Sequence, residues 1–165
     1  STCGIPDKID KLADDGFGGA LSLSLHAPTD EKRKKIMRIA NSYSVNSLIS
    51  ALRRFFDKTG RRVVIEYILI GGFNDTESDA EALKNLLKGL CCHINLIPLN
   101  PTDGCDLRPC SKKHAYEFCD RLTALGLSAT VRRSMGSDVA GACGQLKNRT
   151  VEAQKKNDNE KIYRK

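Results

Sequence analysis

The sequence predicts an α/β fold in which parallel strands alternate with crossover helices, as in half of a (β/α) barrel. Two observations predict it. Apolar, β-branched runs alternate with segments whose apolar residues recur at helical spacing, and no internal repeat or low-complexity stretch interrupts this order. Such alternation implies parallel strands joined by right-handed crossovers. The four strands expected here are half the number that closes a barrel.

The first half of the pattern contains two strands and two helices. Residues 18–27 are apolar and rich in serine, which indicates a strand, and a turn at 28–30 opens a short helix. A longer helix is expected over 46–58, ended by Gly60, and a β-branched strand over 62–70. The longer helix carries an apolar stripe at a spacing of 3.6 residues, formed by Val45, Leu48, Ile49, Leu52 and Phe56.

The second half repeats this order after a break of two glycines. Thr76 and Asp79 have the spacing of a capping box and open a helix with a leucine stripe. Strands are expected over 93–99 and 128–133, and a helix over 111–125 lies between them.

Polar residues alternate with leucines along the first strand. The period of two puts Ser22, Ser24 and His26 on one face and the leucines between them on the other. A polar row opposite a leucine row predicts that Ser24 and His26 face a barrel lumen. From the residues alone, a histidine in this position is more often structural.

Two polar residues interrupt the central strands. Glu66 lies in a β-branched run, where a carboxylate is costly to bury unless it is paired. Either it faces the lumen near a cofactor or substrate, or it forms a salt bridge with an arginine of a neighbouring strand. Asn95 in the next strand raises the same question.

The charge distribution favours an anionic partner, most simply RNA. The net charge is +7, and residues 147–165 contribute more than half of it, with seven basic and three acidic residues. We therefore expect a folded part over 1–146 and a basic, flexible tail over 147–165. The alternative for the tail is a solubilising extension without a binding role. No apolar run reaches the length needed to span a bilayer, so a membrane role is not expected.

Cysteine usage indicates a reducing compartment, and we expect a cytoplasmic protein. There are seven cysteines, an odd number, spread through an α/β pattern rather than a short disulfide framework. Cys105 and Cys110 have the wide spacing of half a zinc site, but no second pair follows. No metal site is predicted from the thiols.

Cys143 lies in a run of small residues over 136–146, where another molecule can approach its sulfur closely. Such a thiol suits covalent chemistry. The alternative is a buried structural cysteine, because free cysteine is among the most buried residue types.

Five ordered segments together resemble the C-terminal half of the RlmN/Cfr family of radical S-adenosylmethionine RNA methyltransferases. The resemblance runs from residue 1 to about residue 146, with Cys3 where serine is common in the family. The segments are Ser1-Thr2-Cys3-Gly4, Leu23-Ser24-Leu25-His26-Ala27-Pro28, Ile65-Glu66-Tyr67, Asn95-Leu96-Ile97-Pro98-Leu99-Asn100-Pro101 and Ala142-Cys143-Gly144-Gln145-Leu146.

The resemblance implies a fold, an activity and a set of site residues. The fold is the C-terminal part of a radical SAM partial barrel. The activity is methylation of adenosine C2 in 23S rRNA and tRNA, with Cys143 as a catalytic residue that carries the methyl group as S-methylcysteine. S-adenosylmethionine would contact the residues matching the family's cofactor motifs, namely Ser1, Ser24, Leu25, His26 and Asn100.

The second implied cofactor, a 4Fe-4S cluster, has no ligands here. The family holds it through a Cys-x3-Cys-x2-Cys motif, and no spacing among the seven cysteines provides one. We therefore expect a fragment that is inactive alone and that self-associates through open sheet edges. The alternatives are a C8-adenosine methyltransferase of the same family, which confers antibiotic resistance, and a non-catalytic remnant that binds RNA or nucleotides.

Overall fold

The computed structural model describes residues 1–100 and 107–132. The chain divides into two units, one formed by residues 1–99 with 106–132 and the other by 100–105 with 133–165. Only the first unit is described as a fold. Its elements are α1 (Pro6–Asp14), β1 (Ser22–Ser24), α2 (Asp30–Ile36), the 3₁₀ turn η1 (Arg38–Asn41), α3 (Val45–Thr59), β2 (Val63–Leu69), α4 (Glu77–Leu87), β3 (Cys92–Pro98), α5 (Lys112–Ala124) and β4 (Ala129–Val131).

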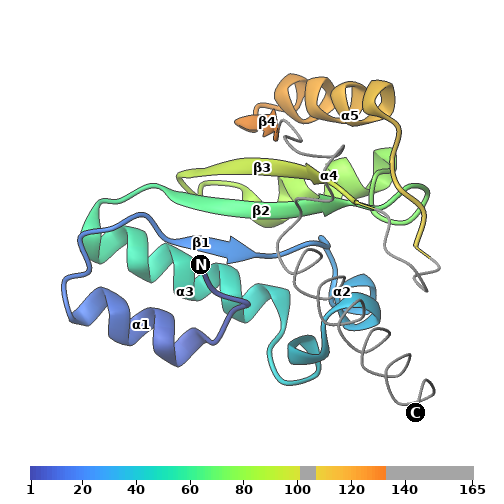
Figure 1. Cartoon of the computed structure of the whole chain (residues 1–165). Coiled ribbons are helices and arrows are strands. Elements are labelled where there is room, and N and C mark those ends of the chain that lie inside the picture. Colours follow the sequence, from blue (N-terminus) through green and yellow to red (C-terminus); the bar gives the residue numbers. More distant parts are fainter. Residues whose placement is uncertain (101–106, 133–165) are drawn as a thin grey trace, which may run out of the picture. The chain divides into compact units, whose positions relative to one another are not determined.

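The four strands form one parallel sheet in the order β1-β2-β3-β4 (Figure 1). Each strand is thus the neighbour of the one before it, as expected when right-handed crossovers curl a sheet toward a barrel. Thr2 extends the sheet beyond β1 through a parallel bridge to Leu23. The predicted α/β fold with parallel strands and crossover helices is confirmed.

The helices lie on one side of this curved sheet, where the core forms. Figure 1 shows α1 beside α3 near β1, and α5 beside β4 at the opposite end. Residues along β2 alternate between buried and half-buried, which is the pattern of a sheet covered on one face. The buried row of the sheet packs against the helices and includes Leu23, Ile65, Ile94 and Leu96, each fully buried.

The helix ends follow the predicted signals. Thr76 and Asp79 form the capping box of α4, with side chain and backbone bonded in both directions. Gly60 ends α3 in the left-handed region at φ 66°.

One position of the apolar stripe predicted for α3 is wrong, because Phe55 and not Phe56 is the fully buried aromatic residue of this helix. The helix turns 100° per residue, so the adjacent Phe56 lies at the edge of the buried face.

Helix α1 was not predicted, although its sequence carries a signal. Pro6 occupies the first turn, where its missing N–H costs nothing, and Ile9 and Ala13 recur on one face and are buried.

The outer strands are shorter than predicted. The expected strand over 18–27 is regular only from Ser22 to Ser24, and His26, at φ 60°, has left the extended conformation. No helix within the described ranges is long and apolar enough to cross a membrane.

The side chain of Asn74 joins the carboxyl ends of β1 and β2. This residue is fully buried in the turn after β2. Its Nδ2 donates to the backbone oxygens of His26, at 2.8 Å, and Ile68, at 2.6 Å. Its Oδ1 accepts a hydrogen bond of 2.8 Å from the backbone N–H of Ile70. The Tyr67 hydroxyl donates to the backbone oxygen of Asn74 at 2.7 Å, so the turn is also fixed from the core side.

Replacing Asn74 by alanine should destabilise the fold strongly. Asn74→Ala leaves one N–H and two carbonyl groups without their partners in a buried turn, and we expect a loss of roughly 3 kcal/mol in the free energy of unfolding. Urea unfolding followed by circular dichroism measures it. The matched control is Asn85→Ala on the exposed face of α4, where a change within about 0.5 kcal/mol is expected. Equal effects of the two variants would contradict the role of Asn74.

Candidate functional site

The half-exposed face of the sheet carries a row of polar side chains, one from each strand. We call it the polar row. The strand register aligns Ser24 with Glu66, Glu66 with Asn95, and Asn95 with Thr130. The leucine side of β1 is buried while Ser22 and Ser24 are half-exposed, so the predicted division of this strand into a polar and a leucine face is confirmed.

Glu66 is paired within the polar row. Its Oε2 accepts a hydrogen bond of 3.0 Å from Asn95 Nδ2. The partner that the structure gives Glu66 is thus an amide, and no ion pair involves Glu66 among the described residues. Arg133, in the expected last strand, lies outside them, so the salt bridge to an arginine stays untested. Glu66 Oε1 has no hydrogen-bond partner among the described residues.

His26 ends the first strand beside the polar row. Its Nδ1 accepts a hydrogen bond of 3.2 Å from the backbone N–H of Ile68. Burial, and secondarily the positive charge of Arg33, lower the pKa of His26 to about 4. The ring is therefore neutral at pH 7, and because Nδ1 accepts, the proton lies on Nε2. His26 thus offers one N–H donor at the carboxyl edge of the sheet.

Arg33 of α2 binds the backbone around the end of β1. It is fully buried. Its Nε donates to the Leu25 oxygen at 3.1 Å, and its Nη2 donates to the oxygens of Cys3, at 2.6 Å, and Ser24, at 3.2 Å. Burial lowers the pKa of the guanidinium. Arg33 does not stand out in the sequence, because the basic run of α2 resembles an ordinary solvated helix face.

The structure brings three of the predicted cofactor residues together in one segment. Ser24, Leu25 and His26 follow one another at the end of β1, and Arg33 also ties this segment to the start of the chain at Cys3. The Leu25 side chain is fully buried, so only its backbone can face a ligand.

The other predicted site residues are not brought into this segment by the described structure. Ser1 is exposed next to Thr2, whose backbone pairs with β1. Asn100 is exposed and belongs to the second unit. Cys143 and the tail over 147–165 lie outside the described residues.

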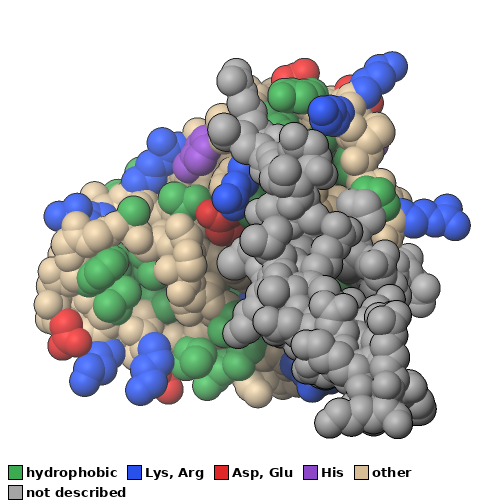
Figure 2. All heavy atoms as spheres, viewed as in Figure 1, with side chains coloured by type: hydrophobic (Ala, Val, Ile, Leu, Met, Phe, Trp, Pro, Cys, Tyr) green, Lys and Arg blue, Asp and Glu red, His purple; other side chains and the backbone are tan. Residues whose placement is uncertain are grey.

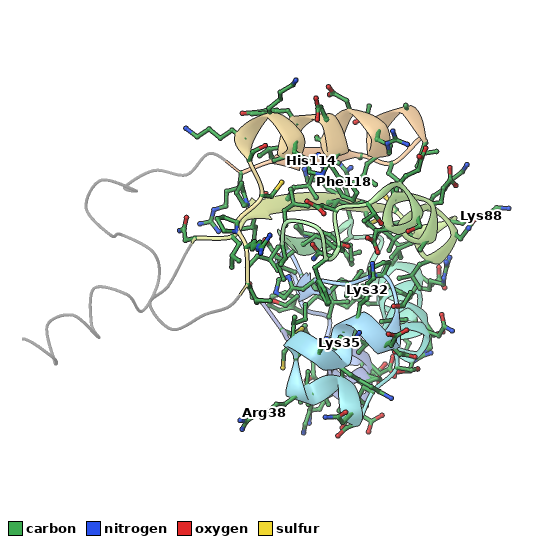
Figure 3. All side chains as sticks on the ribbon, turned by 90° about the vertical axis from the view of Figure 1, so that its right-hand side faces the viewer. Lys32, Lys35, Arg38, Lys88, His114 and Phe118 are labelled. Atoms are coloured by element: carbon green, nitrogen blue, oxygen red, sulfur yellow. The ribbon has the colours of Figure 1, made fainter. Side chains whose placement is uncertain are left out.

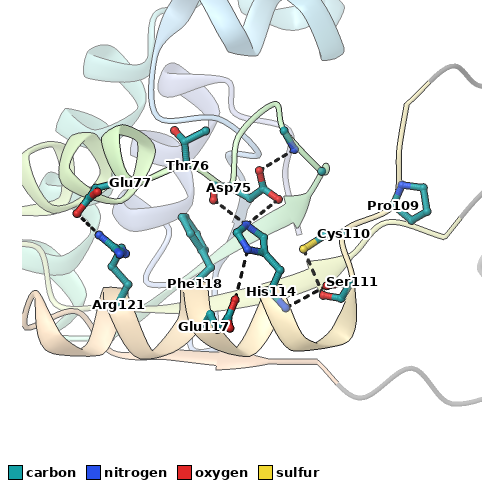
Figure 4. Close-up of a pocket in the computed structure, with 12 residues that line it drawn as sticks. Asp75, Thr76, Glu77, Pro109, Cys110, Ser111, His114, Glu117, Phe118 and Arg121 are labelled. Carbon is teal, nitrogen blue, oxygen red and sulfur yellow. Dashed lines mark hydrogen bonds and ion pairs between the residues drawn. The ribbon is translucent and has the colours of Figure 1, made fainter.

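A hollow of about 660 Å³ lies elsewhere, between the starts of α4 and α5 (Figure 4). It is lined by Gly71, Asp75, Cys110, His114 and Arg121 among others. It shares no residue with the polar row. Within residues 1–100 and 107–132, none of the residues that resemble the family's motifs lines this hollow.

The described cysteines do not fit a 4Fe-4S cluster. Cys3, Cys91, Cys92, Cys110 and Cys119 are free thiols. Within the described ranges the only group of potential metal ligands is Asp75 with Cys110 and His114, which contains a single thiol. Such clusters are held by several thiolates, so no step is assigned to a cluster on these residues.

Several proteins similar to this chain are named as probable RNA methyltransferases. A protein of Clostridioides difficile strain 630, named "Probable dual-specificity RNA methyltransferase RlmN", is 50% identical over 147 residues, covering 89% of this chain and 43% of its own length. A protein of Clostridium perfringens strain SM101 with the same name is 48% identical over 147 residues, covering 89% of this chain and 42% of its own length. The chain thus spans less than half the length of these relatives.

Solved structures agree with this result. The crystal structure of a radical SAM methyltransferase from Sphaerobacter thermophilus matches with a TM-score of 0.83 and 46% identity, over 87% of this chain and 42% of that one. A domain of pyruvate-formate lyase-activating enzyme from Bacteroides vulgatus, 20% identical with a TM-score of 0.60 over 77% of this chain and 74% of that domain, shares the fold alone. No protein-family model matches the chain. The predicted resemblance to the C-terminal half of the RlmN/Cfr family is confirmed.

The His26 ring should stay neutral far below the ordinary pKa of histidine. In an NMR titration, its ring signal, assigned by its loss in His26→Gln, should change with a midpoint near pH 4. Because the folded pKa lies below that of the unfolded chain, the contribution of the neutral ring to stability is fully present above about pH 6.5. It is lost as the pH falls toward 4. A midpoint near 6.5 would show that the ring is neither buried nor bonded as described.

Proposed function

We propose that this chain, a homologue of part of the RlmN-type radical SAM methyltransferases, forms the C-terminal half of an enzyme that methylates adenosine C2 in 23S rRNA and tRNA. One observation carries the proposal. The segment over 23–28, which resembles a cofactor motif of the family, lies at the carboxyl end of β1 beside the polar row. In parallel α/β folds this edge is where ligands bind.

The groups at this edge suit S-adenosylmethionine. The cofactor carries a sulfonium cation, ribose hydroxyls, an adenine ring and an amino-acid end. The Glu66 carboxylate can accept from hydroxyl or ammonium groups, and the His26 Nε2–H and the Ser24 hydroxyl can donate to an oxygen or a ring nitrogen. Ser1 and Asn100 would complete the contacts that the resemblance implies. When bound, S-adenosylmethionine supplies the methyl group and, after reductive cleavage, the radical that the family uses.

The protein's own part in the reaction is to carry the methyl group. The adenine C2 carbon is not nucleophilic, so it cannot take a methyl group by simple displacement. The Cys143 sulfur can: it loses its proton and displaces the methyl group from the sulfonium, leaving S-adenosylhomocysteine and S-methylcysteine. The methyl carbon is then held on the protein until it is transferred to adenine.

RNA as the substrate is supported by charge, though without a single dominant patch among the described residues. On the visible part of the face in Figure 2, lysine and arginine side chains are scattered over several elements. Basic residues also line α2 and η1 at the carboxyl edge, which Figure 3 shows face on. Lys32 is bound to the buried Asp79, at 2.5 Å. Lys34, Lys35 and Arg38 are exposed and can meet phosphates, although Lys35 also pairs with Glu31.

The carrier role of Cys143 predicts a specific modification and a specific loss. The chain should be inserted in place of the corresponding section of the C. difficile relative, so that the remaining sections are present. Intact-mass and peptide analysis of the purified chimera should find one added methyl group on the peptide that contains Cys143. Nucleosides from its RNA substrate should contain 2-methyladenosine. Cys143→Ala should abolish that product while reductive cleavage of S-adenosylmethionine continues.

Matched variants and the unmodified chain serve as controls. Cys91→Ser removes an exposed free thiol and should leave methylation unchanged. The 165-residue chain alone, reconstituted with iron and sulfide, should form no 5′-deoxyadenosine. Methylation by the Cys143→Ala chimera would refute the carrier role, and 8-methyladenosine in place of 2-methyladenosine would refute the proposed position.

A further inference from the structure

The starts of α4 and α5 are held against each other by the backbone. The N–H of Gly71 donates to the Arg108 oxygen at 2.8 Å, and Ile70 forms an antiparallel bridge with Pro109. A Cβ at Gly71 would lie 3.1 Å from the Pro109 oxygen, so the glycine permits this close approach. The residue before the N-cap of α4 and the residue before the N-cap of α5 are thereby brought to one place.

Three residues with metal-binding side chains meet there. They are Asp75 from the turn before α4, Cys110 from the turn before α5, and His114 from the first turn of α5. Their ligand atoms all lie within 4.8 Å of one another. His114 Nε2 is 3.2 Å from Asp75 Oδ2, about the separation of two ligands on a tetrahedral ion. In Figure 4 the Cys110 sulfur and the Asp75 carboxylate both point toward the His114 ring.

We propose that Asp75, Cys110 and His114 form a zinc-binding site. One oxygen, one sulfur and one nitrogen ligand are a set that zinc accepts in tetrahedral geometry. A carboxylate and a thiolate together neutralise the charge of the dication, which suits a half-buried position. All three residues line the hollow between α4 and α5, which has room for a fourth ligand such as water.

The surroundings of the three ligands support the site. The N–H of Gly72 donates to Asp75 Oδ1 at 2.8 Å, which fixes the carboxylate and leaves Oδ2 facing His114. On the other side of the ring, Glu117 Oε2 is 3.6 Å from His114 Nδ1. A metal-bound histidine usually donates its second N–H to such a carboxylate. His114 Nε2 lies 3.1 Å from the backbone oxygen of Asp75, so zinc on Nε2 would replace that hydrogen bond. The ring proton would then lie on Nδ1, where Glu117 can accept it.

The site is independent of the proposed methyl transfer, since it uses no residue of the polar row. It also could not be found from cysteine spacing. The spacing in the sequence associates Cys110 with Cys105. In the structure, the potential metal ligands near Cys110 are Asp75 and His114.

Cobalt binding tests the proposal on the whole chain. The reduced, chelator-treated chain should bind one Co²⁺ with a thiolate-to-cobalt charge-transfer band and the visible bands of a tetrahedral ion, and Zn²⁺ should displace it. Cys110→Ser should remove the charge-transfer band. Glu117→Gln should weaken cobalt binding about 10-fold, because it loses the carboxylate that orients His114. His114→Ala should weaken it further.

Two variants act as matched controls, and circular dichroism verifies that each variant is folded. Cys91→Ser removes an exposed thiol outside the cluster, and His93→Gln removes a ring that binds Ser128 and Thr130. Both should bind cobalt as the unmodified chain does. Absence of stoichiometric binding would overturn the proposal and leave the His114–Asp75 contact as a helix-start hydrogen bond only. A charge-transfer band that persists in folded Cys110→Ser would overturn it as well.

Discussion

The contact on which the candidate site depends most is the hydrogen bonding of Asn74 to the ends of the first two strands. β1 has only three regular residues, and His26 leaves it in a left-handed conformation. Asn74 stabilises this irregular end, because its Nδ2 donates to the His26 oxygen. Its Oδ1 accepts from the N–H of Ile70 and so closes the turn after β2. On the other side, Arg33 binds the oxygens of Ser24 and Leu25. The segment that resembles a cofactor motif is thus held from both sides by buried polar side chains.

These buried groups explain why the site is rigid without covering it. A buried amide or guanidinium is costly without hydrogen bonds, so the bonds that Asn74 and Arg33 make hold the backbone that they contact. Of the buried side-chain nitrogens and oxygens within the described ranges, Arg33 Nη1 alone has no partner. Both donate to backbone oxygens, and the side chains of Ser24 and His26 are half-buried. The helices over residues 1–100 and 107–132 pack against the opposite, buried face of the sheet. The open face therefore combines a fixed backbone with free polar groups, which is the arrangement that ligand binding requires.

Local signals made most of the fold predictable. The capping box at Thr76 and the glycine at position 60 mark helix ends through contacts within a few residues, and the alternation in β1 gave the correct buried face. Motif order gave the family resemblance. What could not be predicted depends on distant partners: the Glu66–Asn95 bond needs the strand register, and the buried state of Arg33 is hidden in a basic run. From the sequence, Asn74 is an ordinary loop residue, and its role depends on the end of β1, which lies beside it only in the folded chain. The metal-ligand cluster needs two loops to meet.

The central claim is that the open polar face, and not the hollow between α4 and α5, receives S-adenosylmethionine. Amide chemical shifts of the isotopically labelled chain, followed during a titration with S-adenosylmethionine, test it most directly. The account predicts shift changes concentrated at residues 24–26, 66–68 and 95–97, with saturation at high cofactor concentration. Changes confined to the residues around Asp75 and Arg121, or no saturable change anywhere, would contradict it.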